Sequence, residues 1–145
     1  GSHTIRFDAS DYDGNAASQK SVTFKIDTVP PTLSVTSPSD GYVTNKSTIT
    51  VSGTTNDATS SPVTVTVNGA SVTVGSNGAF STTVTLSAGT NTINIVAKDS
   101  AGKTTTITRT VKYDPNPPKI TAASVTPNPV DAGKTYVISV TVTDD

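Results

Sequence analysis

The sequence predicts an all-β protein in which thin two-sheet sandwiches follow one another along the chain. Three observations lead to this prediction: a composition suited to strands, runs of alternating apolar and polar residues separated by turns, and an internal repeat. No window of the sequence shows the 3.6-residue period of an amphipathic helix.

The composition favours strands over helices. Thr is the commonest residue, Val and Ser follow it, and none of the 11 acidic residues is Glu. β-Branched side chains fit a pleated sheet, whereas Asp favours turns because it competes for local backbone hydrogen bonds. The hydrophobic content of 32% is low for a globular domain. A thin sandwich with one solvent-exposed face per sheet accommodates such a composition, and a large enzyme core would not.

Charge and missing residue types exclude several classes of protein. A net charge of -1 provides no basic face for nucleic acid or for an anionic membrane surface. No apolar run is long enough for a membrane-spanning helix. Cys, Met and Trp are absent, so disulfides, thiol nucleophiles and thiolate metal sites are impossible. We therefore expect neither a nucleic-acid partner nor membrane insertion.

An internal repeat of about 87 residues is visible. Residues 1–14 align with residues 89–102 at an offset of 88, and residues 24–31 align with residues 111–118 at an offset of 87. The shared features are a Thr-Ile pair, an Asp-x-x-Gly turn and an Asp-x-x-Pro-Pro segment. A repeat of this length suits a sandwich of about seven strands.

The repeat predicts the domain organisation. Residues 1–27 are expected to form the C-terminal strands of one sandwich, residues 28–114 a complete sandwich, and residues 115–145 the N-terminal strands of a following one. Asp27 and Asp114 mark the seams, and consecutive prolines shortly after each favour an extended backbone. We expect short, semi-rigid linkers, with neighbouring domains of the same chain as the main partners.

Within the central unit, apolar residues alternate with Thr and Ser, as in half-buried strands. The clearest run places Val65 and Val67 just before Asn68-Gly69, the sequence of a tight hairpin turn. Another run contains Ile49 and Val51 and is expected to end at Gly53. Seven strands are expected in this unit, with turns about every 8 to 12 residues.

These residues resemble the bacterial immunoglobulin-like repeats, most closely the type first named for domain B of glucodextranase. The resemblance is carried by residues 30–41 (PPTLSVTSPSDG), 49–53 (ITVSG), 65–69 (VTVNG), 78–80 (GAF) and 91–102 (NTINIVAKDSAG). It implies immunoglobulin-like β-sandwiches in a bacterial protein, and it supplies no catalytic residues. Such modules accompany both catalytic and adhesive domains, so the resemblance says more about fold than about activity.

The chain offers little for catalysis. Its one His, His3, lies near the start of a strand, and neither a Gly-x-Ser-x-Gly motif nor a phosphate-binding glycine loop occurs. Paired carboxylates for glycoside cleavage would need an enclosed cleft. We expect no enzyme activity and no required cofactor. The predicted function is a structural spacer or stalk module of a secreted or surface-anchored bacterial protein.

Calcium is the ligand with the most candidate residues. Asp8, Asp11, Asp13 and Asn15 place hard oxygen atoms within eight residues, and Gly14 lets backbone carbonyls turn inward. The alternative is an ordinary Asp-x-x-Gly turn between two strands. The equivalent turn of the central repeat has one acid and a Lys, so calcium binding is not expected in every repeat.

A second possible calcium site lies at the linkers. It would combine Asp27 or Asp114 with acids of neighbouring loops, such as Asp40 or Asp57. An Asp ahead of a proline-containing linker is similar to the arrangement in some calcium-stiffened bacterial adhesin repeats.

Two other functions stay open. Tyr12 and Tyr42, both expected in loops, could stack against sugars, which would make the chain an adhesin or a module that binds cell-wall or extracellular polysaccharide. A subunit of an extracellular filament or phage tail is the other alternative, in which a neighbouring subunit would complete the partial end domains.

Overall fold

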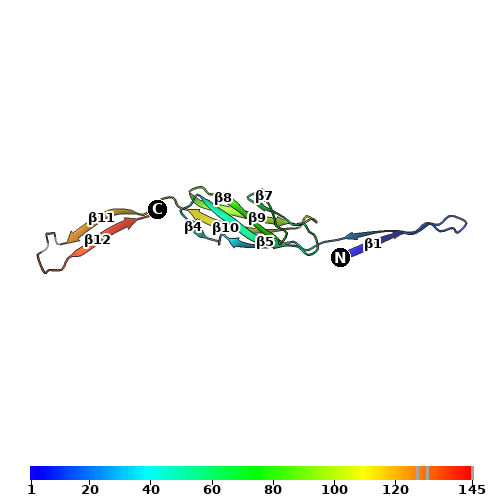
Figure 1. Ribbon diagram of the computed structural model, residues 1–145, viewed down its shortest axis with the longest axis horizontal. Helices are drawn as coiled ribbons and strands as arrows, with labels where there is room; N and C mark the ends of the chain where they lie inside the picture. The colour runs from blue at the N-terminus through cyan, green and yellow to red at the C-terminus, as the bar shows by residue number, and fades with distance from the viewer. Residues whose placement is uncertain (127, 130, 145) are drawn as a thin grey trace.

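The computed structural model describes residues 1–126, 128–129 and 131–144 of the chain, and the elements in this part are β-strands (Figure 1). In it, no helix is long and apolar enough to cross a membrane. The strands are β1 (Ser2–Phe7), β2 (Lys20–Lys25), β3 (Thr32–Ser37), β4 (Tyr42–Thr44), β5 (Thr48–Asn56), β6 (Thr64–Val67), β7 (Ala70–Val72), β8 (Ala79–Thr85), β9 (Gly89–Lys98), β10 (Thr104–Tyr113), β11 (Lys119–Thr126) and β12 (Val137–Thr143).

Strands β3 to β10 form a two-sheet sandwich at the centre of the molecule (Figure 1). One sheet has the order β3-β5-β8, and the other has the order β4-β10-β9-β6-β7. All neighbouring strands are antiparallel except β4 and β10, which are parallel. The predicted all-β, immunoglobulin-like fold is therefore confirmed. The extent of the sandwiches on either side stays a prediction.

The first edge of the sandwich is divided between the two sheets. β3 pairs with β5, and after a short turn β4 pairs with β10. Thr110 of β10 holds the turn from both sides: its N–H donates to Asp40 Oδ1 (2.7 Å), and its carbonyl accepts from the N–H of Gly41 (2.8 Å). Tyr42 therefore begins a strand, and its predicted loop position was wrong. A three-residue strand is too short to show the alternation by which the other strands were recognised.

The core consists of inward-facing residues from both sheets. In β5 and β9, buried and exposed positions alternate along most of the strand. Fully burying a Val or Ile side chain contributes about 1.5–3 kcal/mol. The buried apolar residues are Ile49, Val51, Val65, Val67, Phe80, Leu86, Ile93, Ile95, Ala97 and Val111.

Gly53 lies inside β5, and the prediction that the strand ends there was wrong. β5 continues to Asn56, and Gly53 is paired with Val35 on one side and Phe80 on the other. A Cβ atom at this position would lie 2.1 Å from the carbonyl oxygen of Ser34 and 2.7 Å from the Phe80 ring. The glycine is required because the neighbouring backbone and ring approach too closely for any side chain.

A two-stranded hairpin extends from each end of the sandwich (Figure 1). β1 pairs with β2, and β11 pairs with β12 across a register shift between Ile120 and Ala122. In the described residues, neither hairpin has a second sheet against it. Ile5 in β1 is consequently 48% exposed, whereas Ile93, at the equivalent position of the repeat, is completely buried. Burial at this position depends on an opposing sheet rather than on local sequence.

This comparison predicts the effect of removing the same side chain at two equivalent positions. In the 145-residue chain, Ile93→Ala should lower the free energy of unfolding by about 2–5 kcal/mol, because it leaves a cavity between the sheets. Ile5→Ala should change it by no more than about 0.5 kcal/mol. Urea unfolding followed by circular dichroism measures both. Equal losses would show that the β1–β2 hairpin is packed as tightly as the sandwich.

Candidate metal site at the first junction

Three acidic side chains from distant parts of the chain converge where the linker enters the sandwich. Asp27 follows β2, Asp57 follows β5 and Asp99 follows β9. Each contributes one carboxylate oxygen to a group whose atoms all lie within 4.8 Å of one another. Antiparallel pairing explains why Asp27 and Asp57 meet, because the start of β3 lies opposite the end of β5, at Thr32 and Asn56.

Asp57 is held by its own loop. Its Oδ1 accepts hydrogen bonds from the backbone N–H groups of Thr59 (2.7 Å) and Ser60 (2.9 Å), a pattern typical of an Asp that starts a turn. These amides, together with the Thr59 hydroxyl, keep the pKa of Asp57 below its ordinary value, against the smaller opposing effects of burial and of the Asp27 charge. The residue is 7% exposed, and its Oδ2 is buried without a hydrogen-bond partner.

Asp99 begins the turn between β9 and β10. Its Oδ1 accepts from the N–H of Lys103 (2.8 Å), and its own N–H donates to the Lys103 carbonyl (3.0 Å). Asp99 is 4% exposed, and its Oδ2 is also buried without a partner. The N–H of Ser100 donates to the carbonyl of Ser60 (3.2 Å), which fixes this turn against the Asp57 loop.

Asp27 connects the linker to that loop. Its Oδ1 accepts from the N–H of Val29 (3.0 Å), and its Oδ2 lies 2.8 Å from the hydroxyl of Thr59. The Ser60 hydroxyl, the Val29 amide and the Thr59 hydroxyl, in decreasing order of effect, lower the pKa of Asp27 to about 2. The carboxylate is therefore ionised at neutral pH, close to two buried acids.

The predicted N-terminal calcium loop has a different arrangement. Asp11 repeats the turn of Asp99: its Oδ1 accepts from the N–H of Asn15 (2.8 Å). Its Oδ2 accepts from the Asn15 side-chain amide (2.9 Å), so both oxygens are partnered in an exposed loop. Asp8 Oδ1 accepts from the Gln19 amide (2.7 Å), and Asp13 is exposed. Among the described residues, the three acids that meet within metal-binding distance are those of the first junction.

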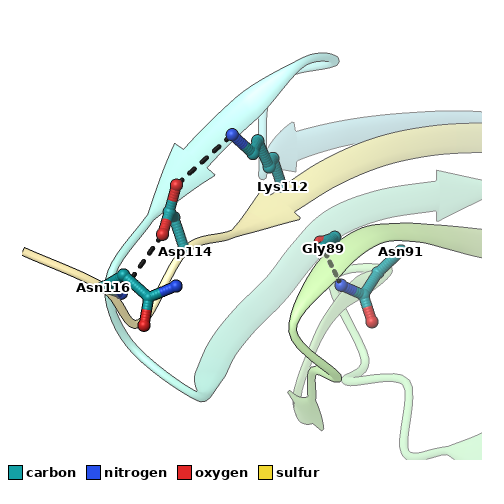
Figure 2. Close-up of polar contacts among 5 residues, drawn as sticks. All are labelled: Gly89, Asn91, Lys112, Asp114 and Asn116. Atoms are coloured by element: carbon teal, nitrogen blue, oxygen red, sulfur yellow. Dashed lines mark hydrogen bonds and ion pairs between the residues drawn. The ribbon is translucent and has the colours of Figure 1, made fainter. Parts of the chain in front are cut away.

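At the second junction, Asp114 is occupied by other groups (Figure 2). Its Oδ1 accepts from the N–H of Asn116 (3.1 Å), which corresponds to the Asp27–Val29 bond, and its Oδ2 pairs with Lys112 Nζ at 3.3 Å. These two contacts, the amide first, hold the pKa of Asp114 below its ordinary value. The same turn thus forms at both linkers, but the ion pair between the linker Asp and a Lys is found at the second one. Of the tyrosines named as sugar contacts, Tyr12 lies in the exposed first turn. Tyr42 begins β4, which pairs with the end of β10 just ahead of the second junction.

The Asp114 contacts predict a low titration midpoint. Its pKa lies below the unfolded value near 3.9, so its contribution to stability is present above about pH 4 and is lost as the pH falls toward the folded pKa. NMR titration of the carboxyl should show this depression. Lys112→Gln should reduce it only partly, because the Asn116 amide remains, and Lys98→Gln is the control. An unchanged midpoint in Lys112→Gln would show that the ion pair does not form in solution.

Residues 31–114 match the protein family described as glucodextranase, domain B. The match covers more than half of the chain and all of the sandwich strands, β3 to β10. The chain belongs to this family, as the sequence motifs had indicated.

Two relatives show the setting in which such sequences occur. The chain is 35% identical over 106 residues to Bacillopeptidase F of Bacillus subtilis (strain 168), covering 73% of this chain and 7% of that protein. It is 32% identical over 137 residues to the PII-type proteinase of Lactococcus lactis subsp. cremoris, covering 86% of this chain and 7% of that protein. The chain therefore corresponds to a small part of each of these much longer proteins.

Fibronectin(III)-like modules of Clostridium thermocellum CbhA provide a structural comparison. The alignment has a TM-score of 0.46 at 20% sequence identity, and it covers 78% of this chain and 62% of that chain.

Proposed function

We propose that the chain is a non-catalytic spacer module of a secreted or surface-anchored bacterial protein. The observation that carries the proposal is that the chain enters and leaves the sandwich at opposite ends (Figure 1). Thr105, near the start of β10, donates its hydroxyl to the carbonyl of Pro31 in the entering linker (2.6 Å), and Asp114, just after β10, donates its N–H to Thr44 (2.9 Å). The ten residues of β10 therefore span the module, roughly 33 Å at about 3.3 Å per residue.

Because the chain enters and leaves at opposite ends, each module adds its own length to an array of modules. A repeat whose ends lie close together would fold the array back on itself, whereas opposite ends extend it with each copy. The prolines after Asp27 and Asp114 restrict the linkers, and each of these acids closes a turn with the amide two residues later. The comparisons support the proposal, because the matched part is a small fraction of two long proteinases, as expected of a module that positions another domain.

The site chemistry also supports a role without catalysis. His3 lies on an exposed strand and stacks on Phe24, with ring centroids 5.6 Å apart. Each of the three acids at the first junction accepts a backbone N–H of its own turn or linker. Two of them are buried, which limits their contact with a substrate in solution.

A spacer must hold its two ends at a fixed separation. The chain has no Cys, so Ser21→Cys in β2 and Ser139→Cys in β12 allow one spin label on each hairpin. Pulsed electron spin resonance should give one narrow distribution at long distance. Changing Pro117 and Pro118 to Gly should broaden it. A distribution that is already broad, or that includes short distances, would contradict the spacer function.

A shallow groove beside β4 favours a second function, glycan binding. It has a volume of about 640 Å³ and is lined largely by Thr and Ser hydroxyls, with Tyr42 at its side. Tyr42 is 45% exposed as a residue, which leaves ring surface for a sugar to stack against. This volume lies in the usual range for small-ligand sites.

If the groove binds glycans, binding should depend on Tyr42, which lines the groove, and not on Tyr12. On a panel of bacterial cell-wall polysaccharides, Tyr42→Ala should abolish binding, while Tyr12→Ala, on the distant first turn, should leave it unchanged. Unaltered binding by Tyr42→Ala, or no binding by the unmodified chain, would exclude the groove as a glycan site.

A further inference from the structure

We propose that Asp27, Asp57 and Asp99 together bind one Ca²⁺ ion that fastens the entering linker to the end of the sandwich. The acids come from three separate segments, and no sequence motif links them. Their oxygens lie within 4.8 Å of one another. Ca²⁺ binds oxygen at 2.3–2.6 Å, so two oxygens on opposite sides of one ion are separated by about 4.6–5.2 Å. The observed spacing therefore permits a single ion in contact with all three.

Two carboxylate oxygens of the group are buried without a hydrogen-bond donor, and a bound cation would satisfy both. Asp57 and Asp99 are more than nine-tenths buried, yet Oδ2 of each accepts no hydrogen bond. Leaving a buried charged acceptor unsatisfied is costly. The Thr59 hydroxyl lies 2.8 Å from both Asp27 Oδ2 and Asp57 Oδ1, and with a single proton it can serve only one of them at a time.

The negative charge of the group is not balanced by side chains. In the part of the chain that the structure describes, the ion pair within 4.0 Å is Lys112 with Asp114, at the other junction. The amino group of Gly1 donates to the carbonyl of Ile26 (2.7 Å), and its charge has the smallest effect among those acting on Asp27. Three neighbouring carboxylates, two of them buried, repel one another unless a cation lies between them.

The donors select calcium rather than other metals. All three are carboxylate oxygens, which suit hard cations, and the absence of Cys removes the soft ligands that transition metals favour. Mg²⁺ is usually held by one or two carboxylates in a strict octahedron with several waters, whereas Ca²⁺ accepts more oxygens in a looser shell. Three carboxylates on separate loops match the calcium pattern.

The ion would change the mechanics of only one linker. Asp27 now contacts the sandwich through the Thr59 hydroxyl, and a shared ion would add direct links to the loops after β5 and β9. Asp114 at the second linker has Lys112 instead. The stiffening effect rests on the proposed spacer function, but ion binding does not, and the two are measured separately.

Calorimetric titration of the full chain with CaCl₂ tests the binding directly. We expect one Ca²⁺ per chain, with Mg²⁺ binding much more weakly. Asp27→Asn and Asp99→Asn should each weaken binding by at least about tenfold, because ligand charge sets calcium affinity. Asp114→Asn, the same change at the equivalent linker position, should bind like the unmodified chain. At 100 times Kd, Ca²⁺ should raise the melting temperature by on the order of 10 °C relative to EDTA.

NMR locates the ion independently of affinity. Ca²⁺ should shift the amide signals of Ser60 and Lys103 and leave that of Asn15 unchanged. In Asp99→Asn, the Asn side chain retains an oxygen that can accept the Lys103 amide, so the turn should still form. If Asp99→Asn nevertheless fails to fold, Asp27→Asn still tests calcium binding, because Asp27 precedes the sandwich. The proposal is overturned if millimolar Ca²⁺ does not bind, if Asp27→Asn binds as tightly as the unmodified chain, or if the shifts appear at Asn15.

Discussion

The structure depends on the burial of alternate residues of β5 and β9 between two facing sheets. Val51, Ile93 and Ile95 are completely buried there. Among the described residues, Phe80 is the one aromatic residue of the buried core, and the partly buried Tyr113 packs against that core from outside. With a core this thin, the distance between the sheets is set by a few Val and Ile residues. Removing one of these side chains would therefore disturb the packing of both sheets. The close spacing also requires Gly53, because a side chain there would collide with the Phe80 ring.

The same facing of two sheets brings the acids of the first junction together. β5 and β9 belong to opposite sheets, and the turns that follow them meet at one end of the sandwich, where the N–H of Ser100 donates to the carbonyl of Ser60. Asp favours these turns because its carboxylate accepts backbone amides. Two buried acids thereby arise from ordinary turn chemistry, and the linker acid Asp27 is added to them by the path of the entering chain.

Comparison of the two linkers shows how a repeat can keep a local structure and change its chemistry. Asp27 and Asp114 each close a turn with the amide two residues later, because the Asp-x-x-Pro-Pro segment is the same. The second oxygen of Asp27 faces Thr59, and that of Asp114 faces Lys112. The local turn is thus set by the segment itself, and the partner of the remaining oxygen is set by whichever loop or strand lies beside it.

The sequence by itself determined the all-β class, the repeat, the hairpin at Asn68-Gly69 and most of the core, because alternation and turn residues act over a few neighbours. It indicated Asp27 and Asp57 as possible partners but missed Asp99, which it presented as an ordinary turn acid. Tertiary structure decided that Asp99 is buried beside them, that Ile5 is exposed where Ile93 is buried, and that Gly53 lies mid-strand. Each of these depends on which distant segment packs opposite, and local pattern does not contain that information.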